Sequence, residues 1–346
     1  MRTIKPTRVL LTLSVLALSA LAACNRRPLE DMMEKIMLKV TINLDGVSNV
    51  TCDIYNPDVQ IPNTNTDMMR VMVYDRDNGN LVTQSFISNK STDAAGHQVI
   101  SGELNISYGN YDFLVYNFDT PSTLIKGENN ENTIMAYTSE LPSSAVERYA
   151  GGSSYSGTIS YQPDHTMVSR DKDYRISVHD ELTTVETTAY TVIDTYYIQI
   201  HVEGLQFASS ATAVISGLCP SNVLWPNERT TSPSTAVAFD LLKSTDPRIA
   251  GENKDVLCAV FNTFGKLDDA SSDLIVTFSV IDTAGNLLQK EVNLNQVFRT
   301  EDAIEHHWLL IDDTWVIDNP TPSRPVNGGF QPLVDDWEEV EGEIIL

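Results

Sequence analysis

The chain has 346 residues, a formal net charge of -24 and 42% apolar residues. Binding to nucleic acid requires clustered Lys and Arg that replace the counterions on phosphate, so this charge argues against a nucleic-acid partner. It argues equally against docking of a basic face on an anionic membrane surface. The apolar content is sufficient for a folded protein, and at about 150 residues per domain the length indicates two domains.

The N-terminus has the pattern of a lipoprotein signal peptide. The basic segment Met1 to Arg8 precedes an apolar run from Val9 to Ala23, which is too short to span a bilayer. The run ends in Leu-Ala-Ala followed by Cys24, which resembles the bacterial lipobox. That resemblance implies removal of residues 1–23, lipid attachment at Cys24 and anchoring in the outer membrane with the chain at the cell surface. Ordinary secretion with an incidental Cys24 is the alternative.

The mature chain begins with a polar tether over residues 24–35 and continues as alternating strands. IMLKVTINL, residues 36–44, alternates apolar and polar side chains, which predicts a half-buried strand. The segment MRVMVYDRDNGNLVTQSFI predicts two strands joined by a hairpin turn over Asp77 to Asn80. Similar patterns recur up to residue 190, with a short helix expected between Tyr137 and Tyr149.

The second half repeats this organisation. TYYIQIHVEGL, ATAVISGL, DVLCAVFNTFG, DLIVTFSVID, NLLQKEVNL and HHWLLIDDTWVI read as strands separated by turn residues. Strands at intervals of about ten residues with few helices predict an all-β protein of two tandem antiparallel β-sandwiches. We expect an N-terminal sandwich over residues 36–190 and a C-terminal sandwich over residues 191–319.

The C-terminus, residues 320–346, combines a spacer with a possible terminal strand. Residues 318–329 are dense in Pro and Gly, which predicts a semi-extended spacer. Phe330 to Leu346 then carries apolar residues among six acidic ones. Such a strand can return to its own sheet, which we favour because its apolar residues are then covered, or add to the open sheet edge of another molecule.

The cysteines do not form a metal-binding motif. Cys52, Cys219 and Cys258 show no CxxC spacing and no nearby His pair, which argues against a zinc site. Export permits disulfides, so Cys219 and Cys258 can pair. The alternative, which we favour, is that all three are buried thiols.

No catalytic motif emerges, and we expect a non-enzymatic protein without a cofactor. Counted from Asp75, an EF-hand loop requires Gly at the sixth and an acid at the twelfth position, where Asn80 and Phe86 stand. His306 and His307 are adjacent in an expected strand, so they point to opposite faces. Asp164 and His165 suggest half of a proton relay, but no serine nucleophile motif accompanies them.

Several motifs resemble the fimbrillin-type lipoproteins of Bacteroidales, which include the pilins, anchors and accessory subunits of type V pili. The family pattern is a strand and hairpin with Asp-Gly-x-Leu, of which Gly79 to Leu81 match here, and then a Gly-x-Tyr element before an apolar strand ending in Tyr-Asn. Here Gly109, Tyr111 and the pair Tyr116-Asn117 match it, and ATAVISGLCPSNVLWP resembles a later family strand. The resemblance implies transthyretin-like β-sandwiches and a structural, anchor or accessory role in fimbrial assembly or adhesion.

The resemblance also implies strand exchange between fimbrial subunits. In pilins of this family a protease cuts after an Arg and removes the first strand, which corresponds here to Ile36 to Leu44. The donor strand corresponds to Phe330 to Leu346. No Arg lies in the loop from Asp45 to Met69, where a cut would release only that strand. This departure from the pilin pattern favours an uncleaved subunit.

A second hypothesis is a carbohydrate-binding surface lipoprotein of a glycan-uptake system. Such a protein is also lipid-anchored and built of β-sandwiches, and it holds sugars on exposed aromatic rings. The candidate sugar platforms are the four tryptophans, although most are expected in the core: Trp225, Trp308, Trp315 and Trp337.

Overall fold

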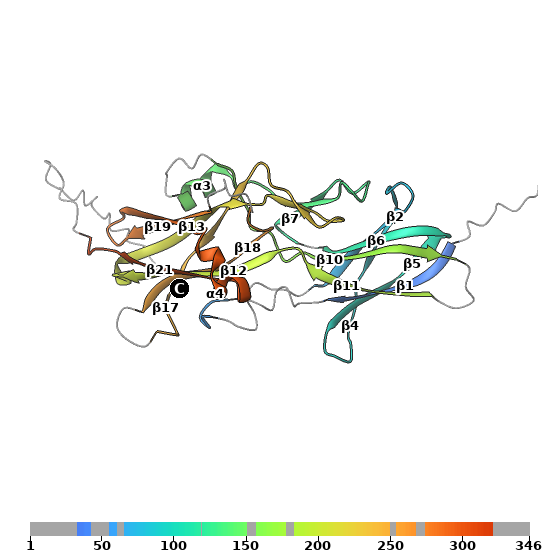
Figure 1. Cartoon of the computed structure of the whole chain (residues 1–346), viewed down its shortest axis with the longest axis horizontal. Helices are drawn as coiled ribbons and strands as arrows, with labels where there is room; N and C mark the ends of the chain where they lie inside the picture. The colour runs from blue at the N-terminus through green and yellow to red at the C-terminus, as the bar shows by residue number, and fades with distance from the viewer. Residues whose placement is uncertain are drawn as a thin grey trace, which may run out of the picture.

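The computed structural model describes residues 33–42, 55–60, 66–118, 120–150, 157–177, 183–249, 254–267 and 274–320. In this part of the chain, strands far outnumber helices, and they form two β-sandwiches that lie end to end along the long axis of the molecule (Figure 1). The predicted all-β fold of two sandwiches is therefore confirmed.

The first sandwich is one eight-stranded sheet in the order β3-β2-β6-β10-β11-β1-β5-β4. Its strands are β1 (Met33–Ile42), β2 (Met68–Asp75), β3 (Leu81–Ile87), β4 (Asn89–Thr92), β5 (Gln98–Ser107), β6 (Gly109–Phe118), β10 (Met167–Ile176) and β11 (Thr183–Thr191). β10 and β11 share only two residue pairs, and β3 runs into β4 after one residue. The sheet therefore bends at both places, and its two halves face each other across a core.

Alternation along the strands builds this core. Met69, Val71 and Val73 of β2 point inward, as do Phe113 and Val115 of β6. Successive side chains of a strand point to opposite faces, so every second residue enters the core. The hairpin predicted over Asp77 to Asn80 is confirmed between β2 and β3, where Gly79 adopts a φ of 69°.

One glycine allows the corner between β3 and β4 to pack on the core. A Cβ atom at Gly102 of β5 would lie 2.5 Å from Cγ2 of Ile87, which is far too close. Ile87 is almost fully buried at the end of β3. Only a residue without a side chain lets it reach the core at this point.

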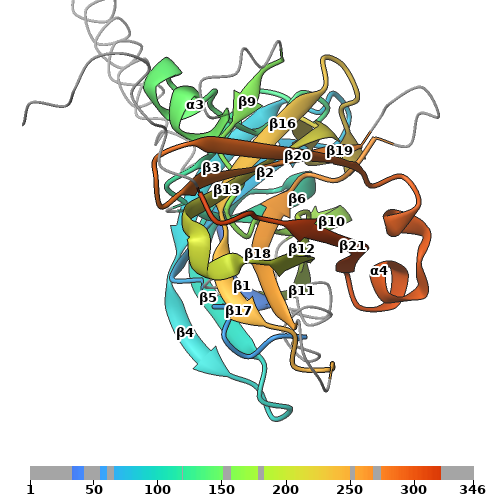
Figure 2. The ribbon, with the colours of Figure 1, turned by 90° about the vertical axis from the view of Figure 1, so that its left-hand side faces the viewer.

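The second sandwich consists of a four-stranded sheet, β17-β18-β12-β21, and a five-stranded sheet, β20-β19-β13-β16-β9 (Figure 2). Its strands are β9 (Ile159–Ser160), β12 (Asp194–Glu203), β13 (Ala208–Leu218), β16 (Thr235–Asp240), β17 (Leu242–Thr245), β18 (Asp255–Thr263), β19 (Ile275–Asp282), β20 (Leu287–Asn293) and β21 (Trp308–Val316). Short helices η1 (Leu205–Phe207), η2 (Val297–Arg299) and α4 (Glu301–Glu305) connect some of them.

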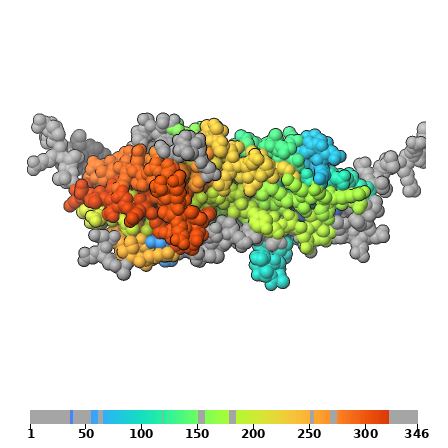
Figure 3. Space-filling view, viewed as in Figure 1, coloured from blue at the N-terminus to red at the C-terminus, as the bar shows by residue number. Residues whose placement is uncertain are grey.

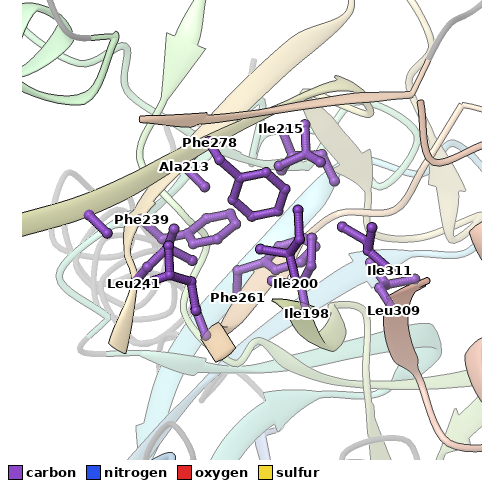
Figure 4. Close-up of a cluster of buried hydrophobic side chains, with 14 of the residues drawn as sticks. Ile198, Ile200, Ala213, Ile215, Phe239, Leu241, Phe261, Phe278, Leu309 and Ile311 are labelled. Carbon is purple, nitrogen blue, oxygen red and sulfur yellow. The ribbon is translucent and has the colours of Figure 1, made fainter. Parts of the chain in front are cut away.

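Aromatic rings fill the core of this sandwich (Figure 4). The rings of Phe239 and Phe261, which come from the two facing sheets, stack with their centroids 4.9 Å apart. Phe278, in the same sheet as Phe239, is fully buried with them. Ile198 and Ile200 of β12 contribute the alternate inward positions predicted from TYYIQIHVEGL. Two apolar sheet faces thus pack against each other, as expected for a sandwich.

A small sheet joins the two sandwiches. It has the order β15-β14-β8-β7, with β7 (Thr123–Lys126), β8 (Met135–Thr138), β14 (Ser221–Val223) and β15 (Glu228–Arg229). Tyr74 and Tyr116, on the outer face of the first sandwich, are buried in one cluster with Trp225 and Phe264. The contact between the sandwiches is therefore an apolar core of its own.

The strand topology shows two features that the sequence did not predict. Three strand pairs are parallel, namely β1 with β11, β12 with β21 and β9 with β16. The helix α3 (Ser143–Ala150), in the region where a helix was expected, and β9 pack with the second sandwich although they precede residue 190. The division between residues 36–190 and 191–319 stays a prediction about folding units, because the chain passes between the sandwiches more than once.

Residues 55–60, which we call the strap, lie on the second sandwich although they precede β2 of the first. In Figure 3 their blue atoms are set among the orange ones of the second sandwich. Tyr55, Asn56 and Val59 are buried there, and the Tyr55 ring lies 5.4 Å from that of Tyr197 and 5.2 Å from that of Trp308. The strap therefore fixes the middle of the long loop between β1 and β2 on the second sandwich.

Buried hydrogen bonds hold the strap. The Tyr55 hydroxyl donates to both carboxylate oxygens of Asp246, at 2.8 and 3.0 Å, and Gln199 Nε2 donates to the same carboxylate at 2.8 Å. Burial alone would raise the pKa of Asp246, but these bonds and one from the backbone N–H of Arg248 lower it. Asn56 Nδ2 donates to Ser244 Oγ at 3.0 Å. The strap therefore satisfies buried polar groups of the second sandwich.

We expect Tyr55→Phe to lower the free energy of unfolding by about 1–3 kcal/mol, because a buried carboxylate loses a donor while the ring is kept. Urea unfolding monitored by circular dichroism measures the effect. Tyr190→Phe is the matched control, since Tyr190 is 54% exposed, and should change nothing measurable. Equal stability of the two variants would contradict the structural role of the strap.

Candidate functional site: the slot filled by the first strand

β1 is a central strand. It forms nine antiparallel residue pairs with β5 and seven parallel pairs with β11. We call the space between β5 and β11, now filled by β1, the slot. Withdrawal of β1 would leave the backbone N–H and C=O groups of two strands without partners, which is unfavourable wherever water cannot replace them.

The side chains of β1 also close the core. Ile36 stands opposite Leu104, and Leu38 stands opposite Gly102. Both Ile36 and Leu38 are fully buried, and burial of such a side chain contributes about 1.5–3 kcal/mol. The slot therefore accepts an extended segment with apolar residues at alternate positions, and β1 already meets that requirement.

The two ends of β1 lie at opposite ends of the first sandwich. Ile42 pairs with Ala189 near the end of β11, and β11 leads directly into β12 of the second sandwich. Met33 pairs with Ser107 at the opposite end of the first sandwich. The chain thus enters β1 at the end remote from the second sandwich and leaves it towards that sandwich and the strap.

The sequence between β1 and the strap offers no basic residue. Residues 43–54 contain neither Arg nor Lys, and residues 61–65, between the strap and β2, contain none either. The next basic residue, Arg70, lies within β2 and forms an ion pair with Glu128 at 2.6 Å. A protease that cuts after basic residues therefore has no position in this loop from which to release β1.

The predicted lipid attachment residue Cys24 and the predicted donor segment Phe330 to Leu346 lie outside the described residues, as does Cys52. Cys219 and Cys258 are both buried and form no disulfide with each other, so the alternative of a disulfide between them is wrong. Burial raises the pKa of the Cys258 thiol to about 11, which makes it an inert core residue.

The structure differs from the sequence-based expectations for His306, His307 and His165. The expectation that His306 and His307 share a strand is wrong, because β21 begins at Trp308 and His307 adopts a φ of 58°. Asp164 accepts hydrogen bonds from the backbone N–H groups of Ser122 and Thr123, at 2.6 and 2.8 Å. It therefore caps a turn, and His165 beside it is buried with neither ring nitrogen hydrogen-bonded within the described chain.

The structure also locates three of the four tryptophans that were candidate sugar platforms. Trp225, Trp308 and Trp315 are buried, so their proposed use as exposed sugar platforms is wrong, and Trp337 lies outside the described residues. Among the described residues no group of three or more His, Cys, Asp or Glu side chains is arranged to hold a metal ion. No helix in the same residues is long and apolar enough to cross a membrane.

Sequence reasoning missed the strap. Tyr55 and Asp246 are separated by 191 positions, and nothing local to either residue indicates the other. The only sequence signal was an isolated aromatic residue in a loop otherwise rich in Asn, Pro and Thr. Such a residue needs an apolar surface, but the sequence does not say which.

We expect Leu38→Ala to lower the free energy of unfolding by about 2–5 kcal/mol, because it leaves a cavity where β1 closes the core. Met37→Ala is the matched control: Met37 is the neighbouring residue on the other face of β1 and is only partly buried, so its loss should stay below about 1 kcal/mol. Chemical unfolding measures both. Similar losses would show that β1 is not packed in the slot.

We expect acid to destabilise the protein through His165. Burial lowers the pKa of His165 to about 4, against an ordinary value of 6.5. Between these values the unfolded chain binds the proton and the folded chain does not, so the free energy of unfolding falls as pH falls, by about 3 kcal/mol in all. Unfolding at pH 7 and pH 4.5 should show a smaller difference for His165→Phe than for the natural chain; equal differences would contradict the assignment.

Two known proteins are similar to this chain over most of its length. A Bacteroides ovatus protein described as "Putative fimbrium anchoring subunit Fim4B" is 23% identical over 355 aligned residues, which cover 93% of each chain. A crystal structure of a "putative adhesin" from Bacteroides ovatus superposes with a TM-score of 0.55 at 19% identity, covering 86% of this chain and 96% of that one. The second likeness confirms the fold, and together they confirm the resemblance to fimbrillin-type proteins.

A protein-family model also matches this chain. The family described as "Domain of unknown function (DUF5119)" matches residues 47–240. The match begins after β1, includes the strap and all later strands of the first sandwich, and ends with β16 of the second. It covers more than half of the 346 residues. The chain therefore belongs to the DUF5119 family.

Proposed function

We propose that this chain is a non-enzymatic subunit of a fimbrium at the cell surface, and that it acts as an uncleaved anchor or accessory subunit. The observation that carries the proposal is β1 itself, which fills the slot between β5 and β11 as a central strand paired on both sides. A subunit that keeps its own first strand does not take up the terminal strand of a neighbour in that slot, so it suits one end of a filament.

Two further observations support the uncleaved state. The loop after β1 has no basic residue at which a cut would release that strand, and the strap in the middle of the loop is buried on the second sandwich. The similar Bacteroides ovatus protein, which is aligned over 93% of each chain, carries the name of a fimbrium anchoring subunit. An anchor that keeps its first strand also keeps whatever lipid precedes it.

The geometry suits a lipid anchor at Cys24. Nine positions separate Cys24 from Met33, the first residue of β1, and this length spans at most about 30 Å. Met33 lies at the end of the first sandwich remote from the second. A lipid on Cys24 would therefore hold the first sandwich near the outer membrane and present the second sandwich to other fimbrial subunits.

We expect Cys24→Ala to move both this chain and the fimbriae from the membrane fraction to the medium, because the lipid would no longer hold them. Immunoblots of membrane and medium fractions from fimbriated cells measure the distribution. Cys219→Ala is the matched control, since it removes a buried thiol far from the N-terminus and should leave the fimbriae attached.

Mass spectrometry of the membrane-held chain provides the second readout. Peptides from residues 33–42 should be present, which shows that β1 is retained. Loss of those peptides from the assembled protein would contradict an uncleaved subunit. Fimbriae that stay on cells making only Cys24→Ala would contradict the anchoring role.

A further inference from the structure

A groove lined largely by Ser and Thr residues lies where the small sheet meets the five-stranded sheet of the second sandwich. It has a volume of about 320 Å³ and is lined by fourteen residues, of which eight are Ser or Thr. Most of them come from β7, β8, β9, β14, β16 and the turn before β16. The yellow segment that includes this turn lies in the middle of the molecule in Figure 3. The volume falls within the range of about 300–1,000 Å³ that is typical of small-ligand sites.

Several hydroxyls in the groove have no protein partner. Within the part of the chain that the structure describes, no hydrogen bond is made by the side chains of Thr138, Ser232 or Ser234. Ser232 and Ser234 are exposed, and Thr138 is partly buried. Behind them, the buried hydroxyls of Ser160 and Thr235 bond to each other at 2.9 Å. A hydroxyl both donates and accepts, so this lining matches a ligand that itself carries many hydroxyls.

The remaining lining adds an aromatic ring and a balanced pair of charges. Tyr137 projects from β8 on the face away from the buried Ala136. Lys126 Nζ lies 4.6 Å from the centroid of the Tyr137 ring, and Glu140 brings the one carboxylate of the groove. One cation and one anion leave the groove close to neutral in a chain of net charge -24. This balance favours a neutral ligand over a charged one.

Neither β8 nor β16 offers a free strand edge to a peptide, and β7, at the edge of the small sheet, contributes only Lys126 to the groove. β8 lies between β14 and β7, and β16 lies between β13 and β9. The outer edge of β9 is also occupied, because Leu141 N donates to Ile159 O and Tyr161 N donates to Ser139 O. An extended peptide gains most of its affinity from such edges, so the groove suits a ligand bound by side chains.

We propose that this groove binds a neutral oligosaccharide, with the hydroxyls of Thr138, Ser232 and Ser234 bonding to sugar hydroxyls and Tyr137 packing against a sugar ring. This activity goes beyond the fimbrial role and does not depend on it. It would give a subunit at the cell surface a direct contact with glycans.

The test is isothermal titration of the purified full chain with maltohexaose, cellohexaose and mannohexaose. At least one of these neutral probes should bind. Tyr137→Ala should weaken that binding by about tenfold or more, the effect of losing roughly 1.4 kcal/mol of contact. The double variant Ser232→Ala and Ser234→Ala, in an exposed turn where folding is not at risk, should weaken it by about threefold to tenfold.

Tyr190→Ala and Ser91→Ala are the controls, because both residues are exposed on the first sandwich and should leave binding unchanged. The proposal is overturned if none of the three probes binds, or if the groove variants bind as tightly as the natural chain. It is also overturned if a peptide of residues 330–346 binds the groove and displaces the sugar, because the groove would then be a peptide site. None of these outcomes bears on whether Cys24→Ala releases fimbriae.

Discussion

The hydrogen bonds that β1 makes on both sides hold the first sandwich together. Among the described strands, β5 has the short β4 as its only other neighbour in the sheet, and β11 shares only two residue pairs with β10. Without β1, this half of the sheet would separate into two parts, and the core would open at Ile36 and Leu38. The fold is therefore complete only with a strand in the slot, whether that strand comes from the same chain or from another. This requirement makes the origin of the strand the central question about such a subunit.

The strap connects that question to the second sandwich. Tyr55 and Asn56 supply hydrogen bonds to Asp246 and Ser244, which are buried on the outer face of the four-stranded sheet. The segment after β1 is thus part of the structure of the second sandwich. Together with the apolar cluster around Trp225, it binds the two sandwiches through contacts that are buried on both sides. Loss of β1 by a cut before the strap would leave the strap in place and the slot empty.

Polar groups are arranged differently beneath the strap and in the groove beside Tyr137. Around Asp246 every donor is directed at one buried carboxylate, which is the arrangement expected of a structural cluster. In the groove beside Tyr137, the exposed hydroxyls of Ser232 and Ser234 form no hydrogen bond to any other described residue, as expected of a surface that exchanges water for a ligand. Trp225, Trp308 and Trp315 are buried in apolar clusters, so the proposed sugar site consists of Ser, Thr and Tyr side chains and not of tryptophans.

Alternation of period two in segments such as MRVMVYD and TYYIQIHVE determined that the chain is all-β and which side chains enter each core, because that pattern is a local property of a strand. The apolar run before Cys24 likewise predicts export and lipid attachment without any tertiary information, and both stay predictions. The neighbours of β1 could not be read in this way, since an alternating strand looks the same at an edge and at the centre of a sheet. The pairing of β1 with β11, the contact of Tyr55 with Asp246, and the groove that both Tyr137 and Ser234 line each bring together residues about 95 or more positions apart. Only the crossing of the chain between the sandwiches decides these contacts, because no local pattern specifies which distant surface a segment will meet.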